Sequence, residues 1–475
     1  MAFINGEMID CGGSPSAVIN PANGETVGHV RMADAKVMAR AIDAAAAAGK
    51  TWGNTLAAER ELILIRMADM VETRRDELVS ILIDEAGSTF GKAMFEVEFT
   101  AAMLRSAAGE ARRIFGHVIP SDAPGTLSLT IRRPLGVVGA IAPFNYPFLL
   151  GTKKICMALA AGNTVVLKPS EETSLIGLKS AEIFQAAGLP AGVLNVVPGD
   201  GATLGKVLVE DPRVRLISFT GSTRVGRLLA TQCAGQGKKI TLEMGGKSPL
   251  VVLGDADVDY AVKTAAFGIF SHQGQICMAG SRIIVEAGIY DAFLDRFVAK
   301  VKTLKMGDPR QPDTVIGPLI RRSQCAFVAE RIAGAVKAGA RVLCGGHSTG
   351  NFFEPTVIAD VVPAMAVFRE ELFGPVASVI KARDAEHALE LANDSCYGLS
   401  SAVLTNDLQL AMRFAQELES GIVHINSSTI EDNPHAPFGG VKDSGMGREG
   451  GQWSMEEMTE TKWITIQQGV REYPF

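Results

Sequence analysis

The apolar positions of the chain follow two main patterns, and each predicts a different kind of secondary structure. Between about residues 34 and 109 they recur at helical spacing with charged residues between them, as in the segment ELILIRMADMV at 61–71. This spacing predicts a run of amphipathic helices. Further along, short runs that are apolar throughout alternate with helical segments, which is typical of strands buried on both faces of a parallel sheet.

These apolar runs form two groups. The first lies at 136–142, 164–167, 192–197 and 216–219, and the second lies at 248–253, 281–286, 377–380 and 421–426. Two groups predict two doubly wound α/β domains that share a cleft, with a boundary near Gly245 and Gly246.

Two further segments, 127–131 and 461–466, alternate apolar and polar residues and predict two-faced strands outside the main sheets. An exposed alternating strand seeks a partner edge. We therefore expect these two segments to pair, within the chain or across subunits.

Composition narrows the class of protein. Of the 475 residues, 47% are hydrophobic and 21% charged, as in ordinary folded proteins, and the net charge of −6 does not favour nucleic acid as a partner. The start, MAFINGEMIDCGGSP, lacks a signal-peptide pattern, and no 18-residue apolar run occurs, so a cytoplasmic protein with no membrane partner is expected. The seven cysteines show no CxxC or Cys/His spacing, so we expect reduced thiols and no metal site.

Two glycine-containing strings resemble nucleotide-binding motifs, but the sequence around them does not fit such motifs. The string GMGREG at 445–450 has GxGxxG spacing, but no apolar strand precedes it and no βαβ unit surrounds it. The string GKS at 246–248 lacks the earlier glycine of a phosphate-binding loop, because Thr241 stands there. Neither predicts nucleotide binding.

Two other segments are better placed for a dinucleotide. In FTGSTRVG at 219–226 a strand leads into a helix, and the free N–H groups of such a turn suit a pyrophosphate, although an ordinary turn with a serine cap reads the same way. In KPSEET at 168–173, Lys168 and Glu171 follow a buried strand, where they could bind ribose hydroxyls or simply begin a helix.

A candidate nucleophile lies in GQICMAG at 274–280. Cys277 stands between glycines before a strand, and an accessible thiol can act as a nucleophile, although a lone cysteine is more often a packing residue. Glu243 and Asn145 each follow an apolar strand, so both could turn into the same cleft.

Six motifs in order, PFNYP, KPSEET, FTGSTRVG, LEMGGKSP, GQIC and EELFGP, resemble the aldehyde dehydrogenase superfamily through essentially the whole chain. The resemblance implies an NAD-binding domain at 1–116 and 136–245, a catalytic domain at 246–445, and a small β bridging element for oligomerisation at 117–135 and 455–475. It also implies a homodimer or homotetramer, and an aldehyde as the small-molecule substrate.

The resemblance assigns catalytic roles residue by residue. Cys277 matches the nucleophile that forms a thiohemiacetal and then a thioester, and Asn145 with the Cys277 N–H matches the oxyanion site. Glu243 matches the base that activates water, and Lys154 with Glu449 matches a proton-relay pair. Glu449 thus gains a role within the string that fails as a fingerprint.

The resemblance also implies the cofactor contacts. Lys168 and Glu171 match the adenosine ribose, and Glu371, Phe373 and, more weakly, Gln324 match the nicotinamide ribose. The pyrophosphate turn and the other matching cofactor positions are Gly221, Ser222, Gly226, Ala142, Pro143, Phe144, Ser170, Gly201, Met244 and Gly245. Because the Glu171 carboxylate would repel a 2′-phosphate, NAD is expected over NADP, although Lys168 favours the opposite and NADP use stays open.

The substrate side is predicted to be aromatic and largely uncharged, which suits a flat ring. Asn145, Tyr146, Ile276, Cys277, Met278 and Phe438 match substrate-lining positions, with Phe144 and Phe270 beside them, although Phe270 also reads as core. The string SHQGQIC resembles the benzaldehyde, vanillin and salicylaldehyde branch, which implies an aromatic aldehyde. His272 and His435 could orient a ring hydroxyl or be structural.

Alternatives stay open at this point. An aliphatic or dicarboxylic semialdehyde would use the same machinery, and a CoA-acylating enzyme would share the fold but lack the base that Glu243 supplies. A non-catalytic use of the fold and a cysteine hydrolase are weaker readings, because Cys277, Glu243 and Asn145 are all present and no His/Asn partner pattern can be assigned.

Overall fold

The computed structural model describes the whole chain, residues 1–475. The first of its two large sheets has eight strands. Its strand order is β2 (Glu7–Ile9), β1 (Ala2–Ile4), β9 (Leu194–Val196), β8 (Thr164–Lys168), β7 (Val137–Ile141), β10 (Val214–Thr220), β11 (Lys239–Glu243) and β23 (Gly445–Met446). The five strands from β9 to β11 are parallel, and the outer ones are antiparallel. Among the parallel strands the chain forms β7 first, moves outward through β8 to β9, and then resumes on the other side at β10, so β7 and β10 flank the topological switch point.

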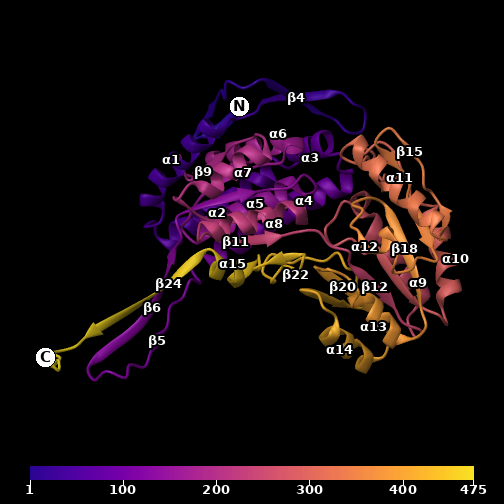
Figure 1. Cartoon of the computed structure of the whole chain (residues 1–475). Helices are drawn as coiled ribbons and strands as arrows, with labels where there is room; N and C mark the ends of the chain where they lie inside the picture. The colour runs from indigo at the N-terminus through magenta and orange to yellow at the C-terminus, as the bar shows by residue number, and fades with distance from the viewer.

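Helices cover both faces of this sheet (Figure 1). They are α1 (Ala35–Trp52), α2 (Ala57–Thr73), α3 (Arg75–Ala86), α4 (Phe90–Glu110), α5 (Pro147–Ala160), α6 (Ser174–Ala186), α7 (Gly201–Glu210) and α8 (Thr223–Gly235). Val138 and Ala140 join the core formed with α2, α4, α5 and α6, whereas Val137 and Ile141 join the core formed with α1, α7 and α8. Because successive side chains point to opposite faces, a strand with two covered faces must be apolar throughout.

The second sheet has seven strands and the same construction. Its order is β14 (Arg341–Cys344), β17 (Thr356–Ala359), β18 (Val376–Ala382), β13 (Arg282–Glu286), β12 (Pro249–Val252), β20 (Ser400–Leu404) and β21 (Ile422–Ile425). One face packs on α9 (Val258–Phe270) and α10 (Tyr290–Val301), and the other on α11 (Arg322–Lys337), α12 (Ala366–Arg369), α13 (Ala385–Asn393) and α14 (Leu408–Glu417). The expected pair of doubly wound sheets is confirmed, and the domain ranges remain our proposal.

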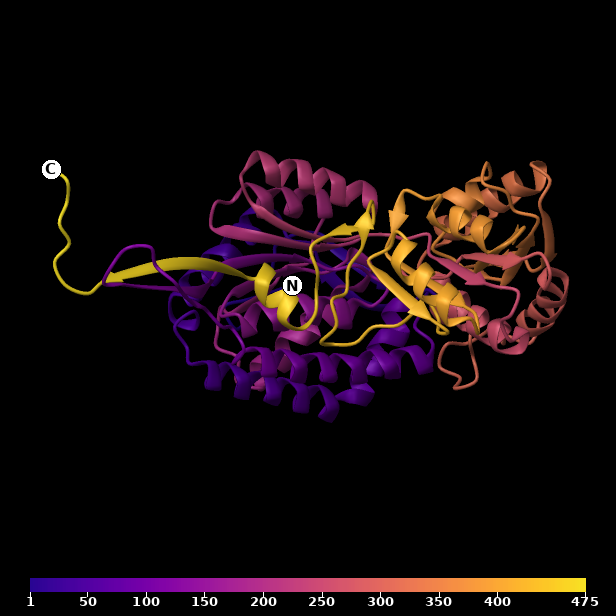
Figure 2. The ribbon, with the colours of Figure 1, turned by 90° about the horizontal axis from the view of Figure 1, so that it is seen from below.

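A third sheet forms an arm that projects from the first body (Figures 1 and 2). It consists of β24 (Thr459–Gln467), β6 (Thr126–Pro134) and β5 (Val118–Ile119), in that order. Lys462 pairs with Ile131 and Ile466 with Leu127, so the two alternating segments pair as expected, within one chain. The short helix α15 (Gly451–Glu457) leads into β24 and packs against α4 and α5.

Small elements complete the fold. Two hairpins pair β3 (Pro15–Ile19) with β4 (Thr26–Arg31) and β15 (Ser348–Thr349) with β16 (Phe352–Phe353), and a third two-stranded ladder joins the distant strands β19 (Tyr397–Gly398) and β22 (Val441–Lys442). Two 3-10 turns, η1 (Glu171–Thr173) and η2 (Ser271–Gly274), lie beside predicted site residues. None of the helices combines the length and apolar character needed to cross a membrane.

Candidate active site

The pyrophosphate turn lies at the switch point, between β10 and α8. The first helical N–H bond of α8 runs from Gly226 to the Ser222 carbonyl at 3.0 Å, and the Ser222 side chain makes no capping bond, so the N–H groups of the first turn are open to a ligand. A Cβ on Gly226 would lie 2.2 Å from Met244 Sδ, so a side chain there would have to displace Met244. Gly221 donates to the Glu243 carbonyl at 3.0 Å and ties this turn to β11. A pyrophosphate fits this cradle.

The predicted adenosine-ribose residues meet around one carboxylate. Glu171 Oε1 lies 2.8 Å from Lys168 Nζ and accepts from the Gly201 N–H at 2.7 Å. Gly201 opens α7, thirty residues further along the chain, and Ser170 caps η1 through the Glu172 N–H at 3.3 Å. The N–H of Ala142, which follows β7, donates to the Lys168 carbonyl at 3.1 Å. This bond joins the end of β8 to the segment that continues to Pro143 and Phe144.

Asn145 is tied to the loop that carries Cys277. It is buried between β7 and α5, and its Nδ2 donates to the Gln275 carbonyl at 2.9 Å. The Cys277 N–H makes no hydrogen bond within the protein, and the amide of Asn145 keeps its second hydrogen. Two donors are therefore available beside the thiol, as an oxyanion site requires.

The thiol and the carboxylate of Glu243 share a buried electrostatic environment. Burial, with Glu371 and Glu243 nearby, raises the pKa of the Cys277 thiol to about 12. Burial and the neighbouring Glu449 carboxylate raise the pKa of Glu243 well above its usual value, against the opposing effect of Lys154 and Lys153. Glu243 Oε2 is buried and has no protein partner. A carboxylate with a raised pKa and a free oxygen suits a general base.

The expected relay pair is present and buried. Lys154 Nζ lies 2.6 Å from Glu449 Oε1, and the Ser218 hydroxyl on β10 lies 3.2 Å from Lys154 Nζ and 3.1 Å from Glu449 Oε1. Although burial opposes ionisation, Lys154 and Lys153 lower the pKa of the Glu449 carboxyl. The string at 445–450 begins as β23 on the edge of the first sheet, so it does not form a dinucleotide fingerprint.

The nicotinamide-ribose candidates lie where the second body meets the first. Glu371 Oε1 accepts from the Gly246 N–H at 3.0 Å, and a Cβ on Gly245 would lie 2.2 Å from Glu371 Oε2. Burial raises the pKa of Glu371 to about 7. The ring of Phe373 meets Phe144 edge-on at 5.8 Å. Gln324 Nε2 donates to the Leu372 carbonyl at 2.6 Å and so holds the loop that carries Phe373, and its contact with the ribose stays a prediction.

The predicted substrate residues and the thiol share one apolar cluster. Ile276, Met278 and Phe438 belong to one apolar cluster, and Tyr146 and Cys277 pack against it. Phe270 is fully buried and stacks on Phe297 with ring centroids 6.2 Å apart, so it is a core residue. His272 is buried and meets Tyr146 edge-on at 5.5 Å, whereas His435 is exposed.

One functional candidate was missed by sequence reasoning. Lys153, the neighbour of Lys154 on α5, is buried, pairs with Asp432 Oδ2 at 3.0 Å and lies 4.2 Å from the centre of the Phe438 ring. The substrate side is therefore not as free of charge as the sequence indicated. Two adjacent lysines in a largely apolar helix were the available signal, because a buried ammonium group needs polar or charged partners.

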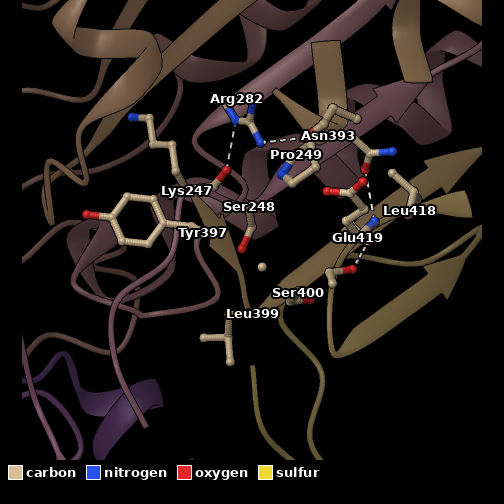
Figure 3. A pocket seen from close by; sticks show the side chains of 14 residues that line it. Lys247, Ser248, Pro249, Arg282, Asn393, Tyr397, Leu399, Ser400, Leu418 and Glu419 are labelled. Atoms are coloured by element: carbon tan, nitrogen blue, oxygen red, sulfur yellow. Dashed lines mark hydrogen bonds between the residues drawn. The ribbon is translucent and has the colours of Figure 1, made fainter. Parts of the chain in front are cut away.

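A separate polar hollow lies behind the segment 247–249 (Figure 3). Arg282 closes one side of it by donating to the carbonyls of Lys247, Leu391 and Ala392. None of the residues assigned above to catalysis or to the cofactor lines this hollow. We interpret it as a structural link between β13 and α13.

The fold and the comparisons with known proteins define an NAD(P)-dependent oxidoreductase that acts on aldehydes. The chain belongs to the aldehyde dehydrogenase family, whose model matches residues 10–464. It is 43% identical to a benzaldehyde dehydrogenase of Bacillus subtilis, with 100% of this chain and 98% of that protein covered. It is 41% identical to a glutarate-semialdehyde dehydrogenase of Pseudomonas putida, with 98% and 97% covered. Among solved structures, a salicylaldehyde dehydrogenase of Pseudomonas putida G7 complexed with salicylaldehyde superposes with a TM-score of 0.98 at 38% identity, covering 100% of this chain and 99% of that one. Family members use NAD or NADP.

Proposed function

We propose that this enzyme oxidises an aromatic aldehyde to the corresponding carboxylic acid. The observation that carries the proposal is the packing of the Cys277 thiol against a cluster that contains Phe438, Ile276 and Met278, with Tyr146 beside it. Such a site accepts a flat apolar ring and leaves the aldehyde carbon at the sulfur. The similarity to benzaldehyde and salicylaldehyde dehydrogenases supports the same substrate class.

The residues around the thiol account for both halves of the reaction. Cys277 gives its proton to Glu243, which passes it on to the Lys154 and Glu449 pair, and the resulting thiolate adds to the aldehyde carbon; the oxygen that gains negative charge accepts from Asn145 Nδ2 and the Cys277 N–H. A dinucleotide held at Glu171, Gly226 and Glu371 would accept the hydride whose loss from the thiohemiacetal carbon leaves the thioester. Glu243 then takes a proton from water, whose oxygen attacks the thioester carbon and releases the acid and the thiol. Lys154 and Glu449 lead the proton away from the buried carboxylate.

We propose NAD as the preferred cofactor. Glu171 binds the Gly201 N–H and Lys168, so its carboxylate is fixed at the predicted ribose position. A 2′-phosphate placed there would meet this negative charge, although Lys168 offsets part of it.

We propose a homo-oligomer assembled through the arm. β24 is the outer strand of the arm's sheet, so one of its edges has no partner, and the apolar side chains of Trp463 and Ile466 are exposed. An open edge with exposed apolar residues is a natural place for a second copy of the chain to pair. This supports a dimer or a dimer of dimers.

A dicarboxylic semialdehyde is the second candidate, favoured by the similarity to the glutarate-semialdehyde enzyme. The deciding experiment follows reduced-nicotinamide formation by purified protein without CoA, with NAD or NADP and with benzaldehyde, hydroxybenzaldehydes, glutarate semialdehyde and hexanal. Highest kcat/KM on the aryl aldehydes, lost in Cys277→Ala, supports the proposal. Highest kcat/KM on the semialdehyde overturns the aromatic assignment, and a requirement for CoA overturns hydrolysis as the second half.

A further inference from the structure

The ion pair between the buried Lys153 and the partly buried Asp432 leaves hydrogen-bonding capacity unused. Lys153 Nζ makes one hydrogen bond in the protein, to Asp432 Oδ2 at 3.0 Å, although an ammonium carries three donors. Asp432 Oδ1 is buried and accepts from no group of the protein. The two side chains therefore present an unused donor and an unused acceptor next to each other, and unpaired buried polar groups are costly.

The pair lies beside the substrate-lining cluster. Phe438 belongs to that cluster and has Lys153 Nζ 4.2 Å from its ring centre, while Ile430, two residues before Asp432, packs against the same cluster. The charge of Lys153 also acts on the reacting groups, because it lowers the pKa of both Cys277 and Glu243 against the larger effect of burial. The pair thus stands within electrostatic range of the thiol, on the side where a ring would lie.

We propose that Lys153 and Asp432 form a specificity site for a hydroxyl group on the ring of the aromatic aldehyde. A phenolic hydroxyl can accept from Lys153 Nζ and donate to Asp432 Oδ1 at the same time, so it uses both free positions. This inference rests on the proposed function and narrows its substrate to hydroxylated aryl aldehydes.

Other substituents match the pair less well. A methoxy group can accept from the ammonium but cannot donate, so Asp432 Oδ1 stays unpaired. A carboxylate, as on a dicarboxylic semialdehyde, would attract Lys153 but would meet the Asp432 carboxylate at close range. An unsubstituted ring leaves both polar atoms without a partner. The pair therefore discriminates by what the substituent can donate as well as by what it can accept.

The test compares substrates within each variant. We would measure kcat/KM for benzaldehyde and for 2-, 3- and 4-hydroxybenzaldehyde, together with their methoxy counterparts, in wild type, Asp432→Ala, Lys153→Met and the control Asp313→Asn. Asp313 forms an exposed pair with Lys305, so its variant changes a charge without touching the site. We expect wild type and the control to prefer one hydroxy isomer about 10-fold or more over benzaldehyde and over its methoxy counterpart. In Asp432→Ala and Lys153→Met that ratio should approach one.

The ratio separates recognition from a general effect on catalysis. If Lys153 acts only through its charge near Cys277, its loss lowers kcat/KM for all the aldehydes equally. A fall in every kcat/KM value with an unchanged ratio of hydroxy to unsubstituted aldehyde therefore overturns the proposal. Inhibition constants of hydroxybenzyl alcohol against benzyl alcohol give the same comparison if a variant turns over too slowly. Absence of turnover with benzaldehyde and all its derivatives overturns the proposed function itself, whereas equal use of all aryl aldehydes overturns only the hydroxyl site.

Discussion

The side-chain amide of Asn145 donates to the backbone carbonyl of Gln275 over 2.9 Å, and this bond joins the loop after β7 to the loop that ends at Cys277. It fixes the direction in which the second amide hydrogen points. We therefore expect Asn145→Ala to lower kcat/KM by about 10²- to 10³-fold, because one oxyanion donor is lost. Steady-state kinetics with NAD titrated separately would check this, and a change confined to the KM for NAD would contradict the oxyanion role.

Glu243 should control the release of the acid and not the transfer of hydride. In Glu243→Gln we expect a burst of reduced nicotinamide close to one equivalent of active sites, followed by a steady rate reduced at least 10²-fold. Stopped-flow absorbance would resolve the two phases. If the substitution instead slowed the burst phase itself, the impaired step would lie before formation of the thioester.

The same carboxylate should set the pH dependence of wild type. Because the pKa of Glu243 is raised, the group is protonated at low pH and gains its basic form only as the pH rises. The steady-state rate should therefore increase as the pH rises above the range in which an ordinary glutamate titrates, and the Glu243→Gln variant should lose that dependence. A wild-type profile that is flat above this range would argue against Glu243 as the base.

The Lys154 and Glu449 pair should contribute to stability as well as to proton transfer. Lys154→Met leaves a buried carboxylate with only Ser218 as a partner, so we expect the free energy of unfolding to fall by about 3–5 kcal/mol. Lys154→Met combined with Glu449→Leu removes both charges and should recover part of that loss. Urea denaturation monitored by tryptophan fluorescence would measure both variants. Because the folded pKa of Glu449 is lowered, its contribution is present above the unfolded pKa of about 4.3 and is lost as the pH falls.

Glu171 should govern the choice of cofactor. We expect Glu171→Gln to raise the ratio of kcat/KM for NADP over NAD by about 10-fold, because a negative charge is removed from the predicted ribose position. The neighbouring Glu172, which lies 3.4 Å from Arg321, offers a matched control. An equal change in Glu172→Gln would indicate a general effect of charge on this surface.

Most of the fold could be predicted because burial on both faces leaves a direct mark on the sequence. The strands β7, β8 and β10 coincide with continuous apolar runs, and the pairing of β6 with β24 follows from their alternation. Hydrogen bonds between segments that are far apart in the sequence could not be predicted from the apolar pattern. The bond from the Gly201 N–H to Glu171 exists only because the crossover brings the start of α7 back to the end of β8.

The site was less predictable where charge is buried. Lys153 and Lys154 look alike in the sequence, and nothing in the spacing separates the partner at Asp432 from the partner at Glu449. The bond from Gln324 to the Leu372 carbonyl was likewise not predictable from the sequence. The partner of each of these side chains depends on which polar atoms the folded chain brings close to it. The spacing of residues in the sequence does not show this.

The two-residue strand β23 links the end of β11 to the segment that carries Glu449. Gly445 pairs with Glu243 at the end of β11, and the chain runs on from there to Glu449, which binds Lys154. A Cβ on Gly445 would lie 2.5 Å from the Leu242 carbonyl, so the ladder tolerates no side chain at that position. Glu243 and Glu449, far apart from Lys154 along the chain, thus depend on the same short strand, and a substitution at Gly445 should displace the proposed base and the proposed relay pair together.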